Sequence, residues 1–435
     1  MNLEKYPFSV NENGHLDIDG ADAVELAKKY GTPLYVYNVS QIRKNCQAFV
    51  EAFKQLDVKF QVAYASKAFS SIAIIQVIEE EGLSIDVVSE GELYTALQAG
   101  FPPERIHFHG NNKSIGELTM AIEHQIGCII VDNFSEIQLL NELLQKYETT
   151  MDVLIRVTPG ISSKTHEYIM TGNEDSKFGF NIHNGQAEKA FQSLQKSQHI
   201  HFKGLHIHIG SQIFETDNFV KATDRLFKEI SRWYSAYGYI PDVLNLGGGF
   251  PIRYTDNDEP LPLRNYVEKL VHKVKAHVQK LNIPMPELWI EPGRSIVGDA
   301  GLTLYTVGTM KQIPGVRDYV AVDGGMTDNL RPALYQAKYT GLLANKANAP
   351  ITNHPSIAGK CCESGDMLVW NLPLATVESG DILAILSTGA YGYSMANHYN
   401  RFPKPAVVFV ENGEDKLVIR RETYEDVVRN DLPYR

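Results

Sequence analysis

The sequence is poor in cysteine, in positive charge and in long apolar runs, and each shortage excludes a class of protein. Its four cysteines form no CxxC pair, so we expect neither a disulfide framework nor a thiolate zinc site. The net charge of −11 argues against a nucleic-acid partner, which would require a basic face. No stretch approaches the roughly 18 apolar residues of a membrane span, and residues 1–20 lack the apolar core of a secretory signal. We therefore expect a cytoplasmic enzyme without a membrane partner.

Short apolar runs alternate with longer amphipathic runs from about residue 58 to residue 297. Eight of the short runs are typical of buried strands, namely VKFQVAYA, LSIDVVS, RIHFHG, GCIIVDN, MDVLIRVTP, HFKGLHIHIGS, DVLNLGG and ELWIEPG. Strands separated by helices predict parallel βαβ pairing, and eight of them predict a closed (β/α)8 barrel. The alternative, an open doubly wound sheet, is disfavoured because no GxGxxG motif follows the first strand.

The pattern changes after Val297 to strands joined by tight turns. One of these is a predicted hairpin around Asn412-Gly413. The N-terminal runs HLDIDG and PLYVYN are also typical of strands. We therefore expect an α/β barrel at residues 39–298 and an all-β C-terminal domain at 299–435, to which the segment 1–38 contributes.

Polar residues follow nearly all the predicted strands, where the active sites of such barrels lie. This ring consists of Lys67, Asp86, Ser89, His109, Asp132, Arg156, His208, Ser211, Gly247, Gly248, Gly249, Glu291 and Arg294. Taken alone, Lys67 is either a solvated loop residue or a reactive amine at the mouth of the barrel.

His206 and His208 alternate with apolar neighbours in HFKGLHIHIGS, so they share one face of the predicted strand. Two such histidines can bind a metal, but no partner pattern such as HExxH supports this, and we expect no metal. The other interpretations are that His208 stacks on a ring or forms a hydrogen bond, or that it packs in the core.

The run NLGGGFP follows the seventh strand, and its glycines can expose backbone N–H groups to a phosphate. A simple tight turn has the same composition, but barrel phosphate sites favour the loops after strands seven and eight. A lysine, a phosphate loop, a histidine and a glutamate together fit pyridoxal phosphate. Lys67 would bind its aldehyde carbon, Gly249 and Ser211 its phosphate, and Glu291 its ring nitrogen.

Seven motifs span nearly the whole chain, in the order YASKA, HIGSQ, GGGF, EPGRS, DGGM, CCESGD and GAYGYSMANHYN. Together they resemble the fold-type III pyridoxal phosphate-dependent decarboxylases, most closely the branch that acts on meso-2,6-diaminopimelate. The resemblance implies the alanine racemase-like fold, with a barrel followed by a β-domain. It also implies pyridoxal 5'-phosphate as cofactor and a head-to-tail homodimer whose active sites lie at the interface.

The resemblance implies roles for individual residues as well. Lys67 would carry the cofactor, and His208 would stack on its ring. Cys362 and Glu363 would reach in from the partner subunit, with Cys362 protonating the α-carbon. The phosphate and the pyridine ring would be held by Ser211, Gly249, Glu291, Pro292, Gly293 and Arg294, and Tyr391 would contact both cofactor and substrate.

The expected reaction removes the carboxylate at the D-centre of meso-diaminopimelate and leaves L-lysine. The far end of this substrate is an amino acid, so its pocket needs cations and an anion together. Arg294, Arg331 and Tyr335 can hold the far carboxylate, since arginine pairs with that group in bidentate fashion. Glu363 can hold the ammonium group, and Tyr391 completes the substrate contacts.

Alternatives remain for these residues and for the reaction. Taken alone, Arg331 is a surface charge, Cys362 a buried small apolar residue, and Tyr391 a turn aromatic. The reaction alternative is decarboxylation of ornithine, arginine or carboxynorspermidine. A racemase of the same fold is a further alternative, but it would need a second base in place of the sequence CES at 362–364. A regulatory homologue without turnover is another, but it would not need Lys67 or Cys362. The long polar loop at 161–179 is expected to shape or cover the pocket.

Overall fold

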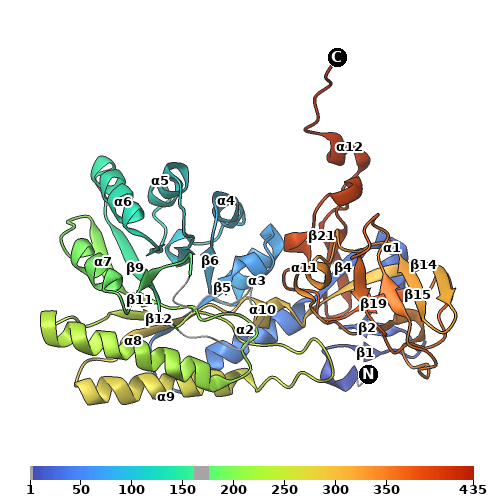
Figure 1. Cartoon of the computed structure of the whole chain (residues 1–435), viewed down its shortest axis with the longest axis horizontal. Coiled ribbons are helices and arrows are strands. Elements are labelled where there is room, and N and C mark those ends of the chain that lie inside the picture. The colour runs from blue at the N-terminus through green and yellow to red at the C-terminus, as the bar shows by residue number, and fades with distance from the viewer. Residues whose placement is uncertain (1–2, 161–175) are drawn as a thin grey trace. The chain divides into compact units, whose positions relative to one another are not determined.

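The computed structural model describes residues 3–160 and 176–435, and the chain divides into two compact units (Figure 1). The barrel unit comprises residues 45–251 and 260–295. The β-unit comprises residues 1–44, 252–259 and 296–435. Most of the loop expected to cover the pocket, residues 161–175, lies outside the described residues.

The barrel unit is built on a closed ring of eight parallel strands, which confirms the predicted (β/α)8 barrel. In ring order they are β5 (Phe60–Ala65), β6 (Ser84–Val87), β7 (Ile106–Phe108), β8 (Cys128–Val131), β9 (Met151–Thr158), β11 (Ile200–His206), β12 (Val243–Asn245) and β13 (Glu287–Ile290). The pairing of Leu288 with Phe60 joins β13 to β5 and closes the ring. A short strand that the sequence did not predict, β10 (Phe180–Asn181), adds to β9.

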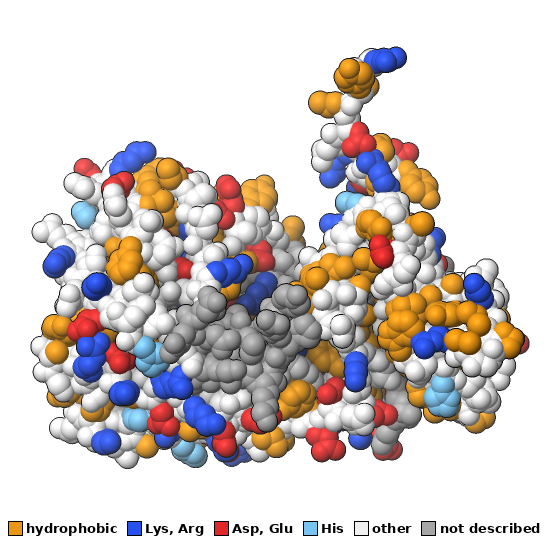
Figure 2. All heavy atoms as spheres, in the orientation of Figure 1, with side chains coloured by type: hydrophobic (Ala, Val, Ile, Leu, Met, Phe, Trp, Pro, Cys, Tyr) orange, Lys and Arg blue, Asp and Glu red, His pale blue; other side chains and the backbone are white. Residues whose placement is uncertain are grey.

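Helices lie outside the strands, as Figure 1 shows. They are α2 (Val39–Lys54), α3 (Ile72–Glu80), α4 (Glu90–Gln98), α5 (Ile115–Glu123), α6 (Phe134–Lys146), α7 (Gln186–Leu194), α8 (Thr216–Tyr237), α9 (Leu263–Leu281) and α10 (Arg294–Val297). Within residues 3–160 and 176–435, no helix has both the length and the apolar character needed to cross a membrane. Figure 2 shows acidic and basic side chains interspersed over the face that it draws.

Four consecutive helices of the barrel begin with the same kind of cap. Ser71, Ser89, Ser114 and Asn133 each accept a hydrogen bond from a backbone N–H in the first turn of α3, α4, α5 and α6. Such caps satisfy donors that the helix itself leaves unpaired. Ser89, a member of the predicted polar ring, therefore has a structural partner in the first turn of α4.

The β-unit contains a three-stranded sheet and a larger mixed sheet. The small sheet consists of β1 (Ser9–Val10), β2 (Leu16–Ile18) and β3 (Ala21–Asp22). The large sheet consists of β4 (Leu34–Asn38), β14 (Gly301–Ile313), β15 (Arg317–Val322), β16 (Gly341–Leu343), β17 (Ser356–Ala358), β18 (Met367–Val369), β19 (Ile382–Ile385), β20 (Ala406–Glu411) and β21 (Glu414–Ile419). Its helices are α1 (Ala23–Tyr30), α11 (Arg331–Tyr335) and α12 (Tyr424–Val428).

The predicted hairpin is present, because β20 and β21 pair antiparallel across Asn412 and Gly413. Both turn residues have positive φ, 52° and 81°, which Asn and Gly adopt readily.

The long strand β14 supplies side chains to two separate cores. Leu302 and Leu304 belong to one apolar cluster, whereas Tyr305 and Val307 belong to another. Leu302 and Leu304 are two residues apart, as are Tyr305 and Val307, and successive side chains of a strand point to opposite faces. Strands β16 and β19 divide their side chains between the same two clusters, so the three strands together separate the cores of the β-unit.

We expect Leu304→Ala to lower the free energy of unfolding by about 2–5 kcal/mol, because the leucine is fully buried and its loss leaves a cavity. Chemical denaturation followed by circular dichroism measures the change. The matched control is Leu417→Ala on β21, where the side chain is 44% exposed and a much smaller loss is expected. Equal losses for the two variants would contradict the central position of β14.

Candidate functional site

Lys67 lies just beyond the end of β5, in a single 3-10 turn formed by Ser66–Ala68. Its neighbours Ser66 and Ala68 are buried, whereas Lys67 is exposed. The strand end is fixed from the other side by the EPGRS motif, since Ala65 donates its backbone N–H to the carbonyl of Pro292 at 3.1 Å. A β-carbon on Gly293 would lie 3.0 Å from Ala65, so only glycine packs there without displacement. The backbone that carries Lys67 is thus held at a defined place at the end of the strand.

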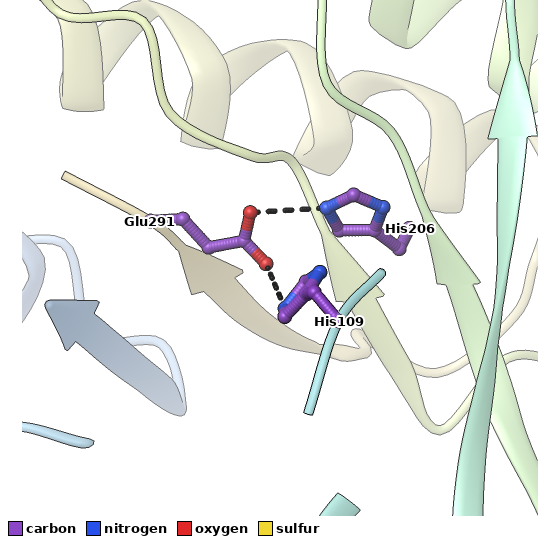
Figure 3. A group of neighbouring side chains, drawn as sticks. All are labelled: His109, His206 and Glu291. Carbon is purple, nitrogen blue, oxygen red and sulfur yellow. Dashed lines mark hydrogen bonds and ion pairs between the residues drawn. The ribbon is translucent and has the colours of Figure 1, made fainter. Parts of the chain in front are cut away.

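The side chain of Glu291, directly after β13, is buried and surrounded by donors (Figure 3). The amide of Asn245 donates to Oε1 at 2.6 Å. His206 Nε2 lies 3.0 Å from Oε2, and His109 Nε2 lies 3.1 Å from Oε1. Burial alone would raise the pKa of Glu291, but His109 and His206 beside it hold that pKa well below its usual value. Glu291 is therefore a buried carboxylate that stays ionised.

The two histidines beside Glu291 are neutral. Burial lowers the pKa of His109 to about 3 and lowers the pKa of His206 as well. A neutral imidazole with Nε2–H directed at Glu291 keeps Nδ1 as an acceptor, and His206 Nδ1 has no hydrogen-bond partner among the described residues. The ligand atoms of His109, His206 and Glu291 lie within 4.8 Å of one another, close enough for a cation. In the arrangement present, however, the same Nε2 atoms are directed at the carboxylate.

Glu291 keeps the capacity to bind one more donor. A carboxylate offers about four lone-pair positions. Asn245 donates to Oε1 and His206 Nε2 lies at hydrogen-bond distance from Oε2, while His109 Nε2 lies 3.1 Å from Oε1 without forming a hydrogen bond, so at least one lone-pair position remains. A protonated pyridine nitrogen would fit that position, so the carboxylate suits the ring of pyridoxal phosphate.

Asp86, at the end of β6, is a second buried carboxyl group with the opposite behaviour. Its Oδ1 lies 3.5 Å from His109 Nε2. Burial, together with the charge of Glu291, raises the pKa of Asp86 well above its usual value. Two neighbouring carboxyl groups are thus driven apart in pKa, a pattern typical of active sites.

The three glycines after β12 pack directly against the two neighbouring motifs. Gly247 and Gly249 have φ values of 72° and 106°, which glycine tolerates best. A β-carbon on Gly249 would lie 2.6 Å from the carbonyl oxygen of Gly210, and one on Gly248 would lie 2.1 Å from that of Glu291. Gly248 also donates its N–H to His208 Nδ1 at 3.2 Å. The close approach of these backbones fits a phosphate cradle.

Arg294 and Ser211 extend the cradle. Arg294 is buried and donates from Nη2 to Ser211 Oγ at 2.9 Å. This contact joins the loop after β13 to the loop after β11 and brings a cation beside the glycines. A guanidinium, a hydroxyl and glycine backbone are groups that bind phosphate and carboxylate.

His208 lies outside β11, which ends at His206, so the predicted alternation through both histidines does not continue to His208. The two side chains have different partners: His206 contacts Glu291, and His208 accepts from Gly248. Burial, together with nearby Lys67 and Arg156, holds the pKa of His208 well below its usual value. A neutral, flat imidazole beside Lys67 suits stacking on an aromatic ring.

Other members of the predicted ring have structural partners. The guanidinium of Arg156 lies 4.4 Å from the centre of the Phe178 ring, a cation–π distance. Asp132 donates its backbone N–H to Glu136, which also pairs with the buried Lys113 at 2.7 Å. Lys113 was not predicted as a polar partner at this end of the barrel.

Asn245 is the contact to Glu291 that sequence reasoning missed. A signal for it exists, because Asn245 is a polar residue inside the apolar strand DVLNLGG, and a buried amide requires partners.

The β-unit carries the remaining predicted residues. Arg331 is buried rather than a surface charge, and it donates to the hydroxyl of Tyr339 at 2.6 Å. Cys362 is exposed, so the alternative of a buried apolar residue is wrong for it. Tyr391 is half-buried and has a φ of 60°. Half-buried Tyr335, on α11, and exposed Glu363 also belong to this unit.

Comparisons with known proteins agree on a family. The family described as "Pyridoxal-dependent decarboxylase, pyridoxal binding domain" matches residues 39–298. The chain is 61% identical to diaminopimelate decarboxylase of Bacillus subtilis (strain 168) over 98% of this chain and 97% of that protein. It is 47% identical to the enzyme of the same name from Staphylococcus aureus (strain COL), over 97% of this chain and 98% of that one. The crystal structure of diaminopimelate decarboxylase from M. jannaschii in co-complex with L-lysine superposes with a TM-score of 0.92 at 36% identity, covering 99% and 98% of the two chains.

The buried histidines of the barrel predict a loss of stability in acid. His107 on β7 stacks on Trp289 at 4.2 Å, and burial lowers its pKa to about 4. The unfolded chain therefore binds a proton that the folded chain does not, so stability falls as the pH drops below the usual histidine pKa of about 6.5. We expect His107→Phe to remove about 2 kcal/mol of the loss between about pH 7.5 and about pH 4.5.

Urea denaturation at several pH values measures this dependence. The control is Phe108→Leu, also fully buried on β7, which removes no titratable group and should therefore leave the pH dependence of the wild type unchanged. An unchanged pH dependence in His107→Phe would show that the pKa of His107 is the same in the folded and the unfolded chain.

Proposed function

The chain belongs to the pyridoxal-dependent diaminopimelate decarboxylases, and we propose that it removes the D-centre carboxylate of meso-2,6-diaminopimelate as carbon dioxide and leaves L-lysine. In this proposal the protein is a carboxy-lyase that completes lysine biosynthesis. The observation that carries the proposal is the ionised, buried Glu291 at the C-terminal ends of the barrel strands, next to a glycine cradle and an exposed lysine, in a chain of this family.

We propose that the barrel unit holds the cofactor, with the cofactor domain at residues 39–298. When bound, pyridoxal phosphate supplies an electron-accepting ring that stabilises the charge left on the α-carbon as carbon dioxide departs. Lys67 holds the cofactor covalently, and Glu291 keeps a proton on the ring nitrogen through its remaining lone pair. The neutral ring of His208 stacks on the cofactor. The phosphate is held by Ser211, Gly249, Pro292, Gly293 and Arg294.

His109, His206 and Asn245 assist by fixing Glu291. Asn245 and His206 hydrogen-bond to the two carboxylate oxygens, and His109 Nε2 lies 3.1 Å from Oε1, so the three side chains orient the carboxylate. Because the histidines are neutral, they orient the carboxylate without neutralising its charge. Asp86, held protonated beside it, adds no competing negative charge.

We propose that the β-unit, residues 299–435 together with 1–38, supplies the substrate contacts. The buried guanidinium of Arg331 stays available as a fixed cation because Tyr339 orients it. Arg331 and Tyr335 bind the far carboxylate of the substrate, with Arg294 of the barrel unit as a further cation for it. Glu363 binds the ammonium group, and Tyr391 contacts both substrate and cofactor. Bidentate pairing with arginine favours this carboxylate over the simple amine of ornithine.

We propose a homodimer with shared active sites, in which Cys362 donates the proton from Sγ to the α-carbon. The exposure of Cys362 and Glu363 in their own chain supports this, because exposed side chains are available to a second copy. The four free cysteines agree with the reducing cytoplasm as the site of action.

The deciding experiment measures carbon dioxide release from meso-diaminopimelate, with L-ornithine and L-arginine in parallel and pyridoxal phosphate supplied. We expect release from diaminopimelate alone, with lysine appearing in step. Lys67→Ala should lose both the release and the visible absorbance of the lysine-bound cofactor, because Lys67 is the amine proposed to bind it. Release from ornithine or arginine only would overturn the roles of Arg331 and Glu363.

Cys362→Ala should lower kcat by about 100-fold or more, since a positioned proton donor contributes at least that factor. KM should change much less, because the thiol is not proposed to bind the ground state. Cys361→Ala is the matched control. Burial, with Asp366 nearby, raises the pKa of Cys361 to about 12, and this half-buried thiol packs within its loop. A large loss in Cys361→Ala with a small one in Cys362→Ala would reverse the assignment.

A further inference from the structure

Three motifs of the β-unit converge on the loop that carries Cys362 and Glu363. They are DGGM at 323–326, CCESGD at 361–366 and the end of GAYGYSMANHYN at 397–400. The proposed function uses Cys362 and Glu363 of the second motif, Tyr391 of the third and no residue of the first. Two polar side chains, Asp366 and Asn400, bind the backbone of this loop directly.

Asp366 joins the first two motifs. Its side chain is buried, with Oδ1 accepting the N–H of Met326 at 2.7 Å and Oδ2 accepting the N–H of Cys361 at 2.8 Å. Its own backbone closes the loop, because its N–H donates to the carbonyl of Glu363 at 3.1 Å and its carbonyl accepts from Gly359 at 2.9 Å. Charge-assisted bonds to backbone N–H groups are among the stronger hydrogen bonds in proteins.

Two glycines make room for this carboxylate. A β-carbon on Gly325 would lie 2.4 Å from Asp366 Oδ2, and one on Gly359 would lie 2.1 Å from it. Both distances are far inside van der Waals contact. The second glycine of DGGM is therefore explained by the approach of Asp366 rather than by a cofactor contact.

Asn400 joins the third motif to the same loop. Its Oδ1 accepts the N–H of Cys362 at 2.8 Å, and its φ of 52° is one that asparagine tolerates. The segment is itself fixed to the first motif, since Asn397 donates from Nδ2 to the carbonyl of Met326 at 3.3 Å and from its backbone N–H to the carbonyl of the next residue, Thr327, at 2.9 Å. The hydroxyl of Tyr399 donates to Glu363 Oε2 at 3.4 Å. Backbone and side-chain bonds thus hold an otherwise exposed loop.

We propose that Asp366 and Asn400 are positioning residues that fix the backbone of Cys362 and Glu363 for proton delivery and substrate binding. The inference rests on the proposed function, because it acts through the thiol of Cys362. Without these bonds the exposed loop would adopt many conformations, and the thiol of Cys362 would occupy many positions. A misplacement of about 1 Å can lower the rate about 100-fold.

The test is a double-mutant cycle on the full-length, cofactor-loaded enzyme. Asn400→Gly removes the acceptor but keeps the backbone conformation, since glycine also adopts positive φ. We expect it to lower kcat about tenfold. In a Cys362→Ala background the same change should lower kcat less than about twofold, because residues that act as a unit are not additive. Asn400→Asp, which retains the acceptor, should restore most of the rate.

The matched control is Asn412→Gly, which makes the same substitution at a φ of 52° in the exposed β20–β21 turn. It should leave kcat unchanged. A second readout needs no turnover: amide hydrogen exchange of the segment 359–366 without substrate. Asn400→Gly should speed exchange at Cys362 at least about tenfold, and Asp366→Asn, which replaces one acceptor by a donor, should speed it at Cys361.

The outcomes separate the two proposals. If Cys362→Ala keeps the wild-type kcat, the proposed function of the thiol is wrong. If Cys362→Ala is slow but Asn400→Gly is not, or if the two losses multiply fully, the positioning role fails while the proposed function stands. Unchanged amide exchange in both loop variants would likewise overturn the inference.

Discussion

The site of this protein depends on one buried charge, the carboxylate of Glu291. A buried, unpaired carboxylate is very costly, so its donors must be in place for it to stay ionised. Those donors, Asn245, His206 and His109, come from β12, from β11 and from the residue after β7. They meet at Glu291 only when the ring of strands is closed. The ionised state of Glu291 therefore depends on closure of the barrel.

In the proposed function, the barrel unit binds the cofactor and the β-unit binds the substrate. The barrel unit holds groups that suit a cofactor, in rigid positions at strand ends: a carboxylate, glycine backbone and a flat imidazole. The β-unit holds groups that suit a substrate with charges at its far end, including the buried Arg331 and the exposed Glu363. In both units, residues proposed to act are hydrogen-bonded to residues without a proposed chemical role: Asn245 donates to Glu291, and Asn400 accepts from the backbone of Cys362.

The barrel was predictable because each strand is a short apolar run bounded by turn residues, and such a pattern can be recognised without knowing the distant contacts of the folded chain. The motif that carries Lys67 and the glycines after β12 were likewise visible as local sequence. The structural role of Ser89 and the roles of Asn245 and Asp366 were not, because each depends on partners that only the folded chain brings near. Residues 252–259 belong to the β-unit for the same reason: Tyr254 packs edge-on against the distant Tyr339 at 5.2 Å.

Strand β14 connects these observations to the way the protein comes apart. Leu302 and Leu304 are buried in one apolar cluster, while Tyr305 and Val307 are buried in another, so the same backbone is shared by both. If water entered either cluster, it would reach the backbone of β14, and the other cluster would then lose the strand against which it packs. We therefore expect the two clusters to unfold together and partial unfolding of the β-unit to begin at peripheral elements such as β21 and α12.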